Sequence, residues 1–86
     1  MKNITPDFKN KVVSFSTDDS ILCIVNPIFE LQCKKLFVIG KVVKGSTTND
    51  WAEGRPCAVA WDKVTDYMVF DSIEQYIELH EKSELN

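Results

Sequence analysis

Apolar residues along this chain fall in short runs that are separated by polar turns, a pattern typical of β-strands. Residues 11–16 ("KVVSFS") and 21–25 ("ILCIV") are rich in β-branched and aromatic residues, and the "TDDS" between them is turn material. Residues 36–45 ("LFVIGKVVKG") give the strongest strand signal, and Gly40 inside them predicts a bulge or a sharp bend. We expect two further strands at residues 56–61 and 66–70.

The stretch between the second and third of these strands is ambiguous. "NP" at residues 26–27 predicts a break in regular structure. In residues 28–35 ("IFELQCKK"), Ile28, Leu31 and Lys35 have helical spacing, whereas Phe29, Leu31 and Cys33 alternate as in a strand. We expect a strand or an irregular crossing here.

Residues 72–83 carry the clearest helical signal. Ser72 and Gln75 form a capping box of the S-x-x-Q type. The side chains that share one stripe follow the i, i+3, i+4, i+7 spacing: Ile73, Tyr76, Ile77 and His80. Ile77 is the central apolar position, so we expect it to be the main contact between this helix and the sheet. Residues 1–10 form a lead-in, with Phe8 placed to pack on the core.

These elements predict one α+β domain over residues 1–86, mostly β from 11 to 70. The expected architecture is a small curled antiparallel sheet or an SH3-like barrel of five to six strands, with one C-terminal helix. The stretch "CAVAWDKVTDYMVF" resembles the end of SH3-like barrels, in which an apolar strand and a tryptophan precede a single helical turn. The resemblance implies a fold and carries no function with it.

Composition and charge narrow the classes of protein. The N-terminus has no apolar leader segment, and no apolar run approaches the ~20 residues of a membrane span. Three cysteines without close pairing predict reduced thiols in a cytoplasmic protein. The net charge of −3 divides into −1 for residues 1–33, +3 for 34–63 and −5 for 64–86. The basic middle segment lacks interleaved aromatic residues, so we do not expect nucleic-acid binding.

The sequence offers little for catalysis or metal binding. Cys23, Cys33, Cys57 and His80 have long, irregular gaps that do not match a zinc site, and apolar neighbours predict that the thiols are buried and structural. A Cys57–His80 dyad is the one conceivable nucleophilic pair, and packing of His80 on the sheet rim is the expected alternative. We therefore predict no catalytic residue, no metal and no cofactor.

The loop between the third and fourth predicted strands is the best candidate site. It is longer than a usual hairpin loop and holds Trp51 and the chain's only arginine, Arg55, the residue types most typical of binding hot spots. In one interpretation Trp51 folds back and plugs a barrel end, with Arg55 stacked on it or paired with Glu53. In the other, Asp50, Trp51, Glu53 and Arg55 contact a protein partner, most simply a second copy in a symmetric homodimer.

The leading expectation is a non-enzymatic protein-binding or adaptor module. One alternative is an acidic inhibitor or immunity-type protein that masks a basic enzyme surface, since the six acids of residues 64–86 would steer such an encounter. An accessory protein of bacterial mobile elements, which the chain resembles in size, belongs to the same alternative. Another is a small barrel that binds nucleic acid or a small ligand.

Overall fold

The structure is a computed structural model that describes residues 5–85, with side chains through residue 82. It contains five strands, one α-helix and two short 3-10 turns. In chain order they are β1 (Val12–Ser16), β2 (Ile21–Gln32), β3 (Lys35–Val42), η1 (Thr48–Asp50), β4 (Pro56–Ala60), η2 (Trp61–Lys63), β5 (Asp66–Phe70) and α1 (Ile73–Leu85).

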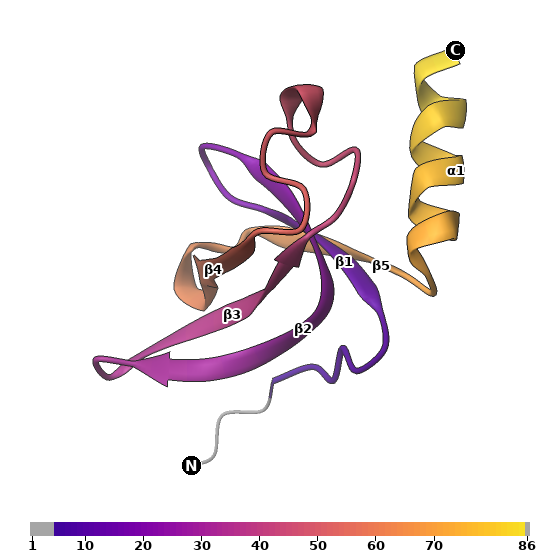
Figure 1. Cartoon of the computed structure of the whole chain (residues 1–86). Coiled ribbons are helices and arrows are strands. Elements are labelled where there is room, and N and C mark those ends of the chain that lie inside the picture. The colour runs from indigo at the N-terminus through magenta and orange to yellow at the C-terminus, as the bar shows by residue number, and fades with distance from the viewer. Residues whose placement is uncertain (1–4, 86) are drawn as a thin grey trace.

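The strands form one antiparallel sheet in the order β4-β3-β2-β1-β5 (Figure 1). The α+β class and the small antiparallel sheet with a C-terminal helix are therefore confirmed. The prediction of a closed barrel is not confirmed, because β4 and β5 are the two edges of the sheet and do not pair with each other. As expected from the sequence, a single turn, η2, separates β4 from β5.

Strand β2 contains a bulge at its centre, where the sequence predicted a break in regular structure. The strand continues through residues 26–27, with a register shift against β3 between Val25 and Ile28. Asn26 adopts a left-handed conformation with φ +49°, which asparagine tolerates better than most residues. The break predicted at "NP" is thus a bulge within one long strand.

The bulge that the sequence predicted at Gly40 lies instead on β2, opposite this residue: β3 pairs regularly with β4 through Gly40↔Cys57, whereas its register with β2 shifts between Val25 and Ile28. A Cβ atom at Gly40 would overlap Cγ2 of Ile24, one of the most deeply buried side chains. Glycine is therefore required where β3 passes close to the bent part of β2.

Strand alternation, and not helical spacing, describes residues 28–32. These residues belong to β2 and pair with β3 from Ile28↔Ile39 to Gln32↔Lys35. The hairpin closes through Cys33 and Lys34, whose φ angles of +52° and +67° are those of a tight two-residue turn. The alternation of Cys33 with Phe29 had indicated a strand position for Cys33. The residue lies in the turn instead.

The two faces of the sheet support two separate apolar clusters. The inner cluster lies within the curl of the sheet and consists of Phe8, Val13, Phe15, Ile24 and Val38. The outer cluster lies between the opposite face of the sheet and α1 and consists of Val12, Cys23, Val43 and Tyr76. Adjacent residues of one strand, such as Val12 and Val13, enter different clusters because strand side chains alternate.

Aromatic rings close the inner cluster. Trp61 is half-buried and meets Phe29 edge-on, with ring centroids 5.0 Å apart, and its ring lies 6.0 Å from that of Tyr67. Phe8, from the lead-in, packs against the rings of Phe15 and Tyr67 at 5.6 and 5.2 Å. The expected core position of Phe8 is thus confirmed, and Trp61 packs at the margin of the same cluster.

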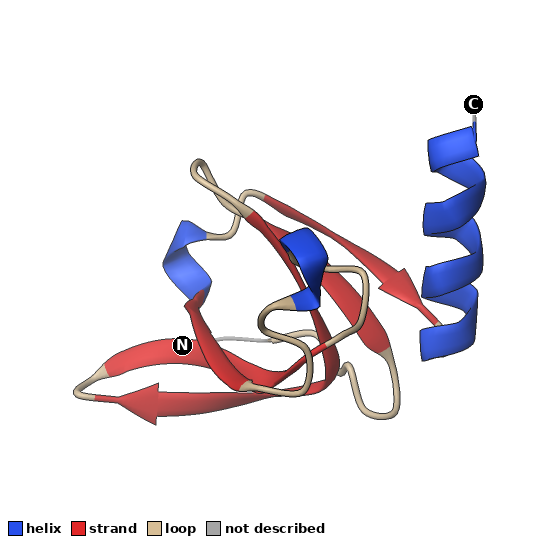
Figure 2. Cartoon of the chain, turned by 45° about the horizontal axis from the view of Figure 1, so that its top comes forward, coloured by secondary structure: helices blue, strands red, loops and turns tan. Residues whose placement is uncertain are grey.

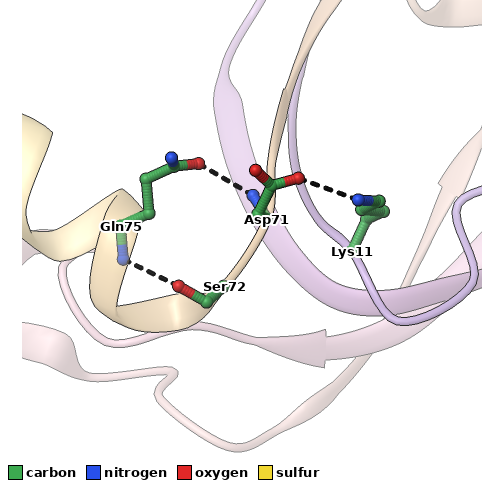
Figure 3. Close-up of polar contacts among 4 residues, drawn as sticks. All are labelled: Lys11, Asp71, Ser72 and Gln75. Atoms are coloured by element: carbon green, nitrogen blue, oxygen red, sulfur yellow. Dashed lines mark hydrogen bonds and ion pairs between the residues drawn. The ribbon is translucent and has the colours of Figure 1, made fainter.

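The start of α1 is fixed by the predicted cap (Figure 3). The Gln75 N–H donates to Oγ of Ser72 at 3.0 Å, and the Asp71 N–H donates to Oε1 of Gln75 at 2.8 Å. Lys11 Nζ forms an ion pair with Asp71 at 2.8 Å, which ties the helix start to β1. The helix runs from Ile73 to Leu85, slightly later at both ends than predicted.

The anchor of α1 is Tyr76 and not Ile77. Tyr76 is 9% exposed and belongs to the outer cluster, whereas Ile77 is half-buried at its margin. The Tyr76 ring meets Phe70 edge-on, with centroids 5.2 Å apart. Figure 2 shows α1 standing beside the strands.

We predict that Ser72→Ala lowers the free energy of unfolding by about 1 kcal/mol, because the Gln75 N–H loses its acceptor. Ser72→Asp should retain most of the stability, since aspartate also accepts this hydrogen bond. Urea denaturation of both variants is the measurement, with Glu78→Ala as a control at an exposed position of the same helix. A wild-type midpoint for Ser72→Ala would contradict the cap.

We predict that Tyr76→Ala lowers the free energy of unfolding by about 3 kcal/mol or more, because a buried ring leaves a cavity in the outer cluster. Ile77→Ala should cost clearly less, since Ile77 is half-buried. Denaturant midpoints of the two variants decide between them. Equal losses, or a larger loss for Ile77→Ala, would contradict the assignment of Tyr76 as the anchor.

Candidate functional site

The loop that carries Trp51 spans residues 43–55 and has a defined internal structure. Asp50 Oδ1 accepts a hydrogen bond from the Gly45 N–H at 2.7 Å, which closes the first part of the loop. Thr47 Oγ1 accepts from the Ala52 N–H at 3.3 Å and spans the second part. Left-handed residues provide the bends: Gly45, Asn49, Asp50 and Gly54.

The base of this loop is fastened to the sheet. Ala52 is buried, and the Gly54 N–H donates to the Val42 carbonyl at 2.8 Å, while the Val42 N–H donates to the Arg55 carbonyl at 3.0 Å. Ser46 Oγ accepts from the Cys23 N–H at 2.8 Å, which joins the loop to β2. The loop is therefore held by the body of the protein on both sides of Trp51.

Trp51 projects into solvent. It is 77% exposed, the largest exposed fraction among the large apolar side chains that the structure describes. Its neighbour Ala52 fills the buried position instead. The interpretation of Trp51 as a barrel plug is therefore wrong for the structure of the single chain, and the tryptophan is available for contact.

The other predicted contact residues divide into two kinds. Glu53 and Arg55 are exposed, like Trp51. The two ion pairs found among the described residues are Lys11–Asp71 and Lys35–Asp62, so the expected Glu53–Arg55 pair is not formed. Asp50 is half-buried and bonded to Gly45, so it shapes the loop and does not belong to the exposed contact set.

The loop also rests against α1. A Cβ atom at Gly45 would lie 3.7 Å from the His80 ring and 3.8 Å from the Tyr76 ring, so both rings pass close to the loop backbone. The His80 ring in turn stacks on Tyr76, with centroids 5.7 Å apart. The predicted packing of His80 beside the sheet thus takes the form of a stack on the helix anchor.

Cys23 and Cys57 are located as the sequence predicted. Burial raises the pKa of the Cys23 thiol to about 12, although the Tyr76 hydroxyl bonds to it and opposes the shift. Burial also raises the pKa of Tyr76 to about 12 and raises the pKa of Cys57. Both thiols are therefore protonated at neutral pH.

Cys33 departs from the prediction of three buried thiols, because it is exposed in the hairpin turn. The two halves of the conceivable dyad are also apart: Cys57 packs against the inner cluster, whereas His80 stacks on Tyr76 of the outer cluster. Within residues 5–85 no three histidine, cysteine or acidic side chains form a group that could hold a metal ion.

One exposed surface was missed by the sequence analysis. Strand β5 carries three consecutive exposed apolar side chains, Tyr67, Met68 and Val69. The sequence "DYMVF" lacks the polar alternation of a half-buried strand, so an apolar strand could be recognised from it. The position of this strand at an edge of the sheet could not, because the strand order was unknown.

No protein-family model, curated protein or solved structure matches this chain. In the part of the chain described, no helix is long and apolar enough to span a membrane.

We predict that the three thiols label at different rates in the native protein. Cys33 should react fastest with a thiol reagent at neutral pH because it is exposed, and Cys23 slowest because it is buried and protonated. Mass spectrometry of peptides from a labelling time course is the measurement, and labelling in denaturant is the control. Slow labelling of Cys33, or equal rates for all three, would contradict these positions.

Proposed function

We propose that this domain is a non-enzymatic protein-binding module and that Trp51 and Arg55 make the main contact with the partner. One observation carries the proposal: Trp51 is 77% exposed on a loop whose backbone is fixed by its own hydrogen bonds. Tryptophan and arginine dominate binding energy at protein interfaces. A loop fixed before binding also loses little conformational entropy when the partner docks.

The exposed set is suited to a mixed apolar and charged partner surface. The Trp51 ring supplies apolar area, Arg55 a guanidinium that bonds carboxylates, and Glu53 a carboxylate at the rim. A single large apolar ring with charged neighbours matches an interface core with a polar rim.

An SH3-like arrangement belongs to the same proposal. The strand order β4-β3-β2-β1-β5 and the one-turn helix between β4 and β5 support it, with the sheet left open. This comparison concerns architecture and adds nothing to the choice of partner.

A second candidate function, an acidic inhibitor of a basic protein, is supported by the charge of α1. Glu74, Glu78 and Glu81 are exposed along the helix, within a segment of net charge −5. Such a surface speeds encounter with a basic partner, and its effect weakens with added salt.

The proposal predicts that Trp51→Ala abolishes capture of specific partners without unfolding the domain. Tagged wild type, Trp51→Ala and Leu31→Ala are expressed in the native host and compared by quantitative mass spectrometry of co-purified proteins. Leu31 is the matched control, because it is 70% exposed and lies near the distant tip of the β2–β3 hairpin. For a purified partner, we expect binding to weaken by about thirtyfold or more with Trp51→Ala.

Two results would contradict the proposal. The first is recovery of the same proteins with Trp51→Ala as with wild type and Leu31→Ala. The second is a large loss of thermal stability in Trp51→Ala, which would give the tryptophan a structural role. Triple substitution of Glu74, Glu78 and Glu81 by glutamine distinguishes the acidic-inhibitor function, which predicts slower association for that variant and an unchanged rate for Trp51→Ala.

A further inference from the structure

Of the nine exposed large apolar side chains among the described residues, six lie on β5, on the first two turns of α1 or at the start of β2. We call them the β5 surface: Ile21, Tyr67, Met68, Val69, Ile73 and Leu79. Because strand side chains alternate, Tyr67 and Val69 lie on the inner face and Met68 on the outer face, so β5 is apolar and exposed on both faces of the sheet. A patch of this kind on a small domain is typical of an interaction site.

Strand β5 is an edge strand without the usual protection. Within residues 5–85 it pairs with β1 on one side and with no strand on the other. The opposite edge, β4, begins with Pro56, which cannot donate a backbone hydrogen bond. Strand β5 has no proline, lysine or bulge, and Asp66 at its start is its one charged residue. Proteins normally avoid such an edge unless it is paired.

A groove continues the β5 surface onto α1. It has a volume of about 500 Å³ and lies between the outer face of the sheet and the helix, with Met68, Ile21 and Leu79 on its walls. The helix packs on the outer face through Tyr76, which contacts Cys23 of β2 and the Phe70 ring at the end of β5, and Figure 2 shows α1 beside that end of the strand. Tyr67, Met68 and Val69 are nevertheless 41%, 63% and 46% exposed, so α1 does not cover these side chains of β5.

We propose that β5 pairs antiparallel with β5 of a second copy of this chain, around a two-fold axis at Met68. In this register Met68 faces Met68, Tyr67 faces Val69 and Asp66 faces Phe70. Aromatic and β-branched residues are favourable cross-strand pairs. The sheets of both copies become one continuous sheet, and the exposed side chains of the two β5 strands become cross-strand neighbours.

The sequence of β5 favours a second copy over an unrelated strand. The strand is apolar on both sides of Met68, so the antiparallel pair brings no like charges opposite each other. A two-fold interface requires this self-complementarity. The exposed acids of α1 lie on the side of the helix away from Tyr76: Glu74, Glu78 and Glu81. In the proposed dimer, the two helices begin at opposite ends of the strand pair.

Sedimentation velocity over a dilution series tests the proposal. We expect the wild-type chain to form a dimer at micromolar concentrations and Met68→Lys to weaken it by about tenfold or more, since two lysines would meet at the axis. Leu31→Lys is the matched control, because it places the same charge at a position of similar exposure outside the β5 surface. Trp51→Ala should leave the dimer unchanged.

Hydrogen exchange distinguishes strand pairing from side-chain contact. Amides of β5 should become more protected as wild-type concentration rises, and those of β4 should not. A wild type that stays monomeric at high micromolar concentration overturns the proposal, as does a dimer that tolerates Met68→Lys as well as Leu31→Lys. A dimer lost with Trp51→Ala instead would assign self-association to the loop. The first two outcomes leave partner capture by Trp51 unaffected, whereas the last would make a second copy the partner of Trp51.

Discussion

The bend in β2 at Asn26 and Pro27 determines where the other elements lie. Residues 21–25 of this strand pair with β1, and β3 pairs with residues on both sides of the bulge, from Ile24 to Gln32. A bulge increases the local twist and bend of a strand. The resulting curl encloses the inner cluster, to which residues on both sides of the bulge contribute. Gly40 is a consequence of the same bend, because it admits the Ile24 side chain.

The outer cluster joins the helix to the loop that presents Trp51. Tyr76 anchors α1 on Cys23 and also passes close to Gly45, while the Cys23 N–H donates to Ser46 of the loop. The Val43 N–H donates to the Cys23 carbonyl at 3.1 Å. Helix docking and loop conformation thus depend on the same few contacts. A defect at Tyr76 is expected to disturb the Trp51 loop, although the tryptophan itself contributes little burial.

The sequence was informative where the deciding contacts are local. β-branched runs located the strands, and the Ser72–Gln75 pair located the helix start, because both signals act over a few residues. Two features depended on contacts between distant residues and could not be predicted: the continuation of β2 through the break at Asn26 and Pro27, and the anchor at Tyr76 instead of Ile77. The exposure of Cys33 follows from the two-residue turn at Cys33 and Lys34, which the ambiguous pattern of residues 28–35 did not indicate. The candidate site was selected by residue type, and the structure shows that Trp51 within it is exposed. Whether Trp51 points inward or outward depends on Ala52 filling the buried position, which no local pattern reveals.

The two exposed surfaces have different physical requirements, and this explains how one small domain can carry both. Strand addition at β5 uses backbone groups and an apolar strand, which suits a copy of the same chain. The Trp51 loop offers a side-chain contact on a fixed backbone, which suits a partner of different sequence. The loop joins β3 to β4 at the opposite edge of the strand order, and its first residues, Gly45 and Ser46, reach the groove that Met68 also lines. Pairing through β5 would therefore give an assembly with two Trp51 loops. Two linked sites bind a partner with repeated or clustered epitopes more tightly than one site does, provided that their spacing allows both to engage.

Strand β5 also carries a risk of aggregation, because an apolar edge strand that lacks its partner strand can pair with other chains.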